Sequence, residues 1–162
     1  MPPINYLFFK KPSKFWDAAS QLRHQVFVQE QGVPESIEID QLDESACHLI
    51  ALHQGEACGV MRILLDVDHA KFGRLATHPS YRKQGIATGM IRQSLRFCYL
   101  AGINTIFLNS QSYITHFYVK LGFEVKGNKF IEAGIPHIPM ELRLPTEDHC
   151  ELYTEDFARK IG

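Results

Sequence analysis

The stretch that decides the fold reads Leu75-Ala76-Thr77-His78-Pro79-Ser80-Tyr81-Arg82-Lys83-Gln84-Gly85-Ile86-Ala87-Thr88. It begins like a strand, turns at Pro79, and then opens a helix through an Arg-x-x-Gly-x-Ala loop. Apolar residues at i, i+4 spacing predict that helix, namely Ile86, Ala87, Met90, Ile91, Leu95 and Cys98. Backbone N–H groups at a helix N-terminus, a flexible glycine and an arginine together suit a pyrophosphate. Taken alone, the pattern also fits an ordinary strand-to-helix turn.

A second motif lies about thirty residues further on. Residues 106–109 read as a buried strand, and residues 112–121 as a short helix that contains Phe117-Tyr118-Val119-Lys120-Leu121-Gly122-Phe123. In this order and spacing, the two segments resemble the pyrophosphate loop and the second cofactor-side signature of the GNAT superfamily of acetyl-CoA-dependent N-acetyltransferases. Two further segments resemble the ElaA-type branch of this superfamily. They are Val26-Phe27-Val28-Gln29-Glu30-Gln31 with Glu38-Ile39-Asp40, and Ala133-Gly134-Ile135-Pro136-His137.

The order of elements predicts the fold class. We expect a strand at 4–10, a helix from Pro12 with an apolar stripe, an acidic loop at 32–44, a hairpin of 48–53 and 58–65, and strands at 72–77 and 138–144. The helix stripe comprises Phe15, Ala18, Ala19, Leu22 and Val26. Antiparallel strands followed by a β-α-β crossover predict an α/β protein with a mixed sheet. The resemblance implies a GNAT fold, with a mostly antiparallel twisted sheet and helices on both faces.

The resemblance covers residues 4–144, which we predict to be one N-acetyltransferase domain. Residues 145–162 form a C-terminal extension, in which Leu152, Phe157 and Ile161 could line a short amphipathic helix. This helix would pack on its own subunit or on a partner, so a homodimer stays open.

Composition narrows the class of protein. The chain has 162 residues, of which 45% are apolar and 22% charged, as expected for one globular domain. A net charge of −1 without a basic stripe argues against a nucleic-acid partner, and no apolar run is long enough for a membrane span. The N-terminus does not resemble a signal peptide, and the four cysteines form no CxxC pair, so we expect free thiols and a cytoplasmic protein.

Charge is unevenly distributed along the chain. No Lys or Arg lies between Arg23 and Arg62, whereas seven carboxylates do: Glu30, Glu35, Glu38, Asp40, Asp43, Glu44 and Glu56. The resemblance places the acceptor wall in this region. Glu30, Glu38 and Asp40 are therefore predicted to bind a cationic or polyamine-like acceptor, whose amine belongs to a small molecule or a peptide. A solvated acidic loop is the alternative.

The resemblance implies transfer of an acetyl group from acetyl-CoA to a primary amine by direct attack in a ternary complex. Strand 75–77 would splay from its neighbour near Asn109, which would leave an N–H for the thioester carbonyl and a gap for the pantetheine arm. The predicted cofactor-binding residues are Leu75, Ala76, Thr77, Arg82, Lys83, Gln84, Gly85, Ile86, Ala87, Thr88, Asn109 and Tyr118. A non-catalytic acyl-CoA-binding module is the alternative.

Proton transfer needs an acid and a base. Tyr118 is predicted to protonate the leaving thiolate, although a core tyrosine would fit the same apolar stripe. Glu30, His48 and His137 are the candidate bases for the amine, and a chain of water molecules could replace them. No His or Cys spacing typical of a metal site is present, so we expect acetyl-CoA as co-substrate and no metal.

Overall fold

The first half of the chain forms antiparallel strands, and a tight turn joins two of them. The turn between β2 (Cys47–His53) and β3 (Glu56–Leu65) holds only Gln54 and Gly55, whose φ angles are 51° and 86°. Two left-handed residues give a hairpin turn whose twist matches that of the flanking strands. β1 (Asn5–Phe9) pairs antiparallel with β2 along its whole length.

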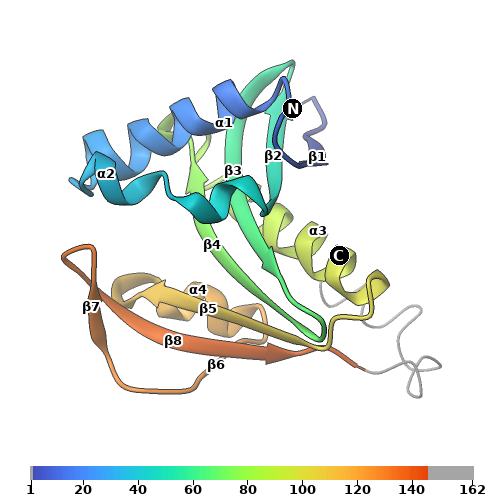
Figure 1. Cartoon of the computed structure of the whole chain (residues 1–162), viewed down its shortest axis with the longest axis vertical. Helices are drawn as coiled ribbons and strands as arrows, with labels where there is room; N and C mark the ends of the chain where they lie inside the picture. Colours follow the sequence, from blue (N-terminus) through green and yellow to red (C-terminus); the bar gives the residue numbers. More distant parts are fainter. Residues whose placement is uncertain (1, 146–162) are drawn as a thin grey trace.

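The second half adds one parallel pair to this sheet. In the computed structural model, which describes residues 2–145, β4 (His69–Thr77) pairs antiparallel with β3 and parallel with β5 (Thr105–Gln111). β8 (Ile135–Arg143) pairs antiparallel with β5, and with the short strands β6 (Glu124–Val125) and β7 (Phe130–Glu132). The strand order is β1-β2-β3-β4-β5-β8-β6, with β7 beside β8 (Figure 1). The predicted mixed and mostly antiparallel sheet is confirmed.

Helices cover both faces of the sheet. Between β1 and β2, α1 (Trp16–Arg23) continues directly into the π-helix η1 (His24–Glu30). Two further short helices follow, α2 (Glu35–Glu38) and the 3-10 helix η2 (Gln41–Glu44). The crossover between β4 and β5 is α3 (Ile86–Leu100), and α4 (Thr115–Lys120) follows β5.

Successive residues of β2 show how the two faces are used. Leu49 and Ala51 pack into the core that contains Met90 and Leu95 of α3, whereas Ile50 packs with residues of α1. Alternate side chains of a strand point to opposite faces, so α1 and α3 lie on opposite sides of the sheet. None of the helices in residues 2–145 combines the length and the apolar content that a membrane crossing requires.

Several predicted boundaries are corrected by the structure. Residues 32–44 are not one loop, because they contain α2 and η2. Ala18 is exposed, so the buried stripe of the first helix is Ala19, Leu22 and Val26. β4 and β8 each begin three residues earlier than predicted. The predicted C-terminal helix lies outside the described residues, and the domain boundary at residue 144 stays a prediction.

Candidate active site

The parallel pair of β4 and β5 opens into a splay. Their pairing runs from His69 opposite Thr105 to Phe72 opposite Leu108 and goes no further, although β4 continues to residue 77 and β5 to residue 111. Figure 1 shows the two strands diverging from this shared end. Backbone groups on these facing strand edges are therefore available to an extended ligand.

A bulge in β4 coincides with the start of the splay. The register between β3 and β4 shifts between Val60 and Arg62, and Arg74 has a φ of 51°. A bulge bends the strand that carries it and increases its local twist. Leu108 is the last residue of β5 paired with β4, so the separation begins at Asn109, as the resemblance implied, but the bulge had no signal in the sequence.

The loop after β4 places backbone N–H groups at one end of the splay. Lys83 and Gly85 adopt left-handed φ angles of 62° and 82°, separated by Gln84. Left-handed residues in such a turn form concave nests of N–H groups that suit anions. Within the described chain, the N-terminus of α3 has neither a side-chain cap nor an acidic residue in its first turn. Its free N–H groups and its dipole favour an anion.

Side chains around this loop hold its shape. Arg82 donates from Nε to the Thr77 carbonyl at 3.2 Å, and Gln84 donates to the Ser80 carbonyl at 3.2 Å. The Tyr81 hydroxyl lies 3.0 Å from Nδ1 of His53 at the end of β2. Tyr81 and His53 were not predicted, because their sequence separation hides the contact.

Tyr118 lies in α4 and packs in the same core as Met90 and Leu95 of α3. Its side chain is 7% exposed, and its ring makes edge contacts with Phe117 at 5.0 Å and Phe123 at 5.8 Å between centroids. Burial raises the pKa of the Tyr118 hydroxyl well above that of a free tyrosine. The hydroxyl is thus protonated at neutral pH and can donate a hydrogen bond.

His137 lies on β8, directly opposite Gln111 at the end of β5. Its Nδ1 lies 2.6 Å from the Ile135 carbonyl, and its Nε2 lies 3.8 Å from a carboxylate oxygen of Glu132. A carbonyl oxygen only accepts hydrogen bonds, so Nδ1 carries the proton of the neutral ring and Nε2 carries the lone pair. This tautomer is the one in which Nε2 can accept a proton.

His48 occupies a different environment. It is 2% exposed, stacks on Phe9 and contacts the ring of Trp16 at a tilt, with ring centroids 5.2 Å and 5.0 Å away. Its Nε2 lies 3.0 Å from the Asp43 carbonyl, and burial lowers the pKa of its ring. β2 also stands two strands away from β4. This environment favours a structural role for His48, and its catalytic role stays a prediction.

Two consecutive residues at the end of η1 reach both sides of the splay. Glu30 pairs with Arg82 of the loop after β4, at 2.7 Å between Oε1 and Nη2. Gln31 accepts a hydrogen bond from the side chain of Gln111, at the end of β5, at 2.9 Å. A continuous series of contacts thus runs from the β4 loop through Glu30, Gln31 and Gln111 to His137, which pairs with Gln111 across the sheet.

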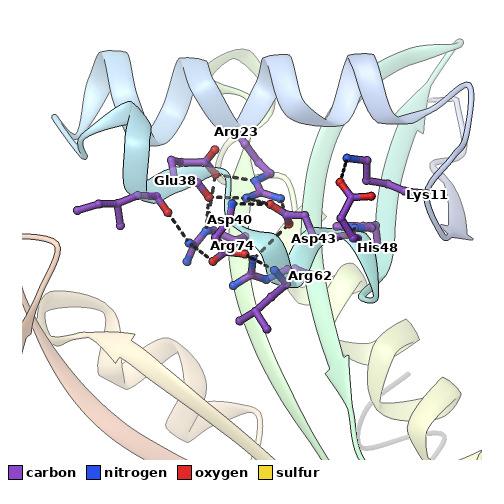
Figure 2. Close-up of polar contacts among 11 residues, drawn as sticks. Lys11, Arg23, Glu38, Asp40, Asp43, His48, Arg62 and Arg74 are labelled. Carbon is purple, nitrogen blue, oxygen red and sulfur yellow. Dashed lines mark hydrogen bonds and ion pairs between the residues drawn. The ribbon is translucent and has the colours of Figure 1, made fainter.

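The remaining predicted acceptor residues belong to a buried ion cluster (Figure 2). Arg23 binds Glu38 at 2.6 Å and Asp43 at 2.7 Å, and its side chain is 2% exposed. Arg62 binds Asp40 at 2.7 Å, and a third arginine completes the cluster. That residue is Arg74, which lies 3.2 Å from Asp40 and donates to the Glu38 carbonyl at 3.0 Å.

Three arginines balance three carboxylates in this ion cluster. Glu38 is itself only 2% exposed, so it cannot line an open acceptor wall. Burial and ion pairing of Glu38 argue against its predicted contact with a cationic acceptor, whereas the Asp40 side chain is 32% exposed and its acceptor role stays a prediction. Both carboxylates link the segment between α1 and β2 to arginines of the sheet. The distribution of charge along the sequence does not reveal these ion pairs, because Arg62 and Arg74 reach the cluster from β3 and β4.

Comparison with known proteins agrees with this geometry. A family model described as "Acetyltransferase (GNAT) domain" matches residues 15–144. YjcF of Bacillus subtilis (strain 168), named as an uncharacterized N-acetyltransferase, is 33% identical over 124 residues, which are 75% of this chain and 88% of YjcF. Two solved structures are each 26% identical and cover 86% of this chain and 99% of their own. They are an acyl-CoA N-acyltransferase from Pseudomonas aeruginosa, with a TM-score of 0.78, and ElaA of Escherichia coli, with a TM-score of 0.77.

Proposed function

Because this chain belongs to the GNAT acetyltransferase family and is therefore an acyltransferase, we propose that it transfers an acetyl group from acetyl-CoA to a primary amine by direct attack. The likeness to ElaA confirms the branch that the sequence resembles. The observation that carries the proposal is the splay of β4 from β5, with the uncapped N-terminus of α3 at its end.

The donor would be held along this splay. Its pyrophosphate would accept hydrogen bonds from the N–H groups of Gly85 and the first turn of α3, with Arg82 as counter-charge. Its pantetheine arm would lie between the edges of residues 73–77 and 109–111 as an added strand. An N–H of β4 beside the bulge, at Leu75 or Ala76, would polarise the thioester carbonyl.

His137 is the base that we propose for the amine. Its tautomer leaves Nε2 free to accept a proton, and Glu132 is close enough to stabilise the resulting imidazolium. His137 also ends the series of contacts that crosses the mouth of the splay through Gln111 and Gln31. We therefore place the acceptor amine, from a small molecule or a peptide, on this side of the gap.

Tyr118 would stabilise the departing sulfur. A thiol has a pKa near 8.5, whereas burial raises the pKa of the Tyr118 hydroxyl far above that value. Complete transfer of the tyrosine proton to the thiolate is therefore unfavourable. The contribution of Tyr118 is then a hydrogen bond to the developing thiolate, and the final proton comes from the amine through solvent.

Calorimetry on two variants of Gly85 tests donor binding. An added Cβ would meet no heavy atom within 4 Å, but φ is 82°, so both Gly85→Asp and Gly85→Ala carry the same backbone strain. Only Gly85→Asp places a negative charge beside the pyrophosphate, which costs about 4 kcal/mol at 4 Å near a protein surface. We expect Gly85→Asp to weaken CoA binding by ~100-fold or more, and Gly85→Ala to weaken it far less.

Acyl transfer itself is measured by the release of free CoA from acetyl-CoA with a panel of primary amines. Folded Gly85→Asp protein that binds CoA as tightly as Gly85→Ala would contradict the proposed loop. Tight CoA binding without amine-dependent thiol release would instead support the non-catalytic acyl-CoA-binding module.

A further inference from the structure

Arg82, the side chain proposed to meet the pyrophosphate, already has an anionic partner. Its Nη2 lies 2.7 Å and 3.0 Å from the two carboxylate oxygens of Glu30, and its Nε is bonded to the Thr77 carbonyl. Arg82 and Glu30 are 41% and 40% exposed, so the pair lies at the surface. Exposed pairs of this kind are weak and exchange readily.

A pyrophosphate on this loop would compete directly with Glu30. If both anions stayed, two groups of like charge would face one guanidinium, and their repulsion would weaken donor binding. The pyrophosphate has the N–H groups of the loop and α3 as further partners. Within residues 2–145, the carboxylate of Glu30 pairs only with Arg82, so it competes less strongly for this guanidinium than the pyrophosphate does.

Glu30 differs in this respect from its neighbours in the acidic segment. Glu38, Asp40 and Asp43 are bound to arginines of the ion cluster, and Glu44 pairs with Lys11 at 2.6 Å. The partners of these four residues lie outside the loop proposed to bind the pyrophosphate, so the pyrophosphate would not compete with them directly. Of these five carboxylates in the described chain, only Glu30 pairs with the arginine that is proposed to bind the pyrophosphate.

We propose that the donor's pyrophosphate displaces Glu30 from Arg82, so that a carboxylate becomes free at the mouth of the splay only after the donor has bound. This inference rests on the proposed function. Glu30 directly precedes Gln31, which is bonded to Gln111 opposite His137, so the released charge stands on the acceptor side. A cationic amine is then attracted to the site when the donor is in place, which favours binding of donor before acceptor.

The test is calorimetric titration of the full chain with CoA alone. Glu30→Gln removes the competing charge and keeps the size of the side chain. We expect CoA to bind Glu30→Gln about two- to fivefold more tightly than wild type at low salt, with the gain lost near 1 M salt. Glu44→Gln is the matched control, because it removes an exposed paired carboxylate of the same segment; we expect its affinity to be unchanged.

A second ligand identifies the competing group. Dephospho-CoA keeps the pyrophosphate and lacks the 3′-phosphate, so the gain in Glu30→Gln should persist with it. A gain seen with CoA but absent with dephospho-CoA would overturn the proposal, because the competitor would then be the 3′-phosphate.

The other outcomes are equally decisive. Weaker CoA binding in Glu30→Gln would mean that Glu30 holds Arg82 ready for the donor, and equal affinity would mean that the pair does not compete; either result overturns the exchange. Wild-type protein that binds no CoA would refute the proposed function, and the exchange with it. Wild-type binding without the predicted gain refutes the exchange alone.

Discussion

Tyr118 shows how one buried hydroxyl can be tested apart from the binding of the donor. Tyr118→Phe removes the oxygen and keeps the edge contacts with Phe117 and Phe123. We expect kcat to fall by about 10²- to 10³-fold, as is typical for loss of one hydrogen-bond donor to a developing anion, while the Kd of CoA stays within about threefold. Tyr113→Phe is the matched control, because Tyr113 is a nearby tyrosine that is 66% exposed.

Steady-state kinetics gives the kcat of both variants, and calorimetry gives their Kd for CoA. If Tyr118→Phe keeps more than about a third of the wild-type kcat, Tyr118 is a core residue that makes no hydrogen bond to the departing sulfur.

Sequence reasoning found single residues where the chemistry is local and missed them where it depends on a distant partner. The loop around Gly85 was predicted because its turn and helix are contiguous in the chain. The different surroundings of His48 and His137 were not predictable, since the carbonyls and rings that contact them come from the fold. The partner of Glu30 lies 52 residues away, so its pairing had no signal in the sequence.

The periodicity of apolar residues predicts the helices and strands well, but it does not predict the irregularities within them. The apolar spacing of α3 and the turn of the β2–β3 hairpin predicted those elements directly. The bulge at Arg74 and the π-helix η1 were missed, because one extra residue in a strand or helix leaves the composition unchanged. Both irregularities adjoin the candidate active site, where such features are frequent.

Gly89 in α3 illustrates how a neighbouring element overrides helix propensity. A glycine there costs the helix about 1 kcal/mol relative to alanine. The hydroxyl of Tyr6 on β1 occupies the space that a Cβ at this position would need. We therefore expect Gly89→Ala to lower the free energy of unfolding by up to about 2 kcal/mol, since overpacking outweighs the gain in propensity.

A double-mutant cycle with Tyr6→Ala measures this effect. With the tyrosine ring removed, Gly89→Ala should become neutral or stabilising by up to about 1 kcal/mol in chemical denaturation. A stabilising effect of Gly89→Ala in the wild-type background would show that Tyr6 moves aside at no cost.

At the scale of the whole molecule, the ion cluster links the segment between α1 and β2 to the sheet. Burial alone would raise the pKa of Asp43, but its bonds to Arg23 and the charge of Arg62 outweigh burial and lower it. A carboxyl whose pKa is lowered by folding contributes stability above its unfolded value of about 3.9, and this contribution is lost as the pH falls through the folded value.

Asp43→Asn should therefore reduce the free energy of unfolding at pH 7 by about 3–5 kcal/mol, because it leaves Arg23 and Arg62 incompletely paired in the interior. Its loss of stability below about pH 4 should be smaller than that of wild type. Urea denaturation at pH 7 and below pH 4 measures both effects, and exposed Glu44→Gln serves as control. Equal acid sensitivity in Asp43→Asn and wild type would show that other carboxyls govern acid unfolding.

The π-helix η1 makes the mouth of the splay sensitive to chain length. Its seven residues, His24–Glu30, place Glu30 and the following Gln31 on the side that faces Arg82 and Gln111. An α-helix turns about 100° per residue, so deleting one residue to regularise η1 would rotate both side chains away by roughly that angle. The number of residues in this segment is therefore constrained as well as their type. Deletion of one residue before Glu30 would remove the contacts of Glu30 with Arg82 and of Gln31 with Gln111, which connect the two sides of the splay.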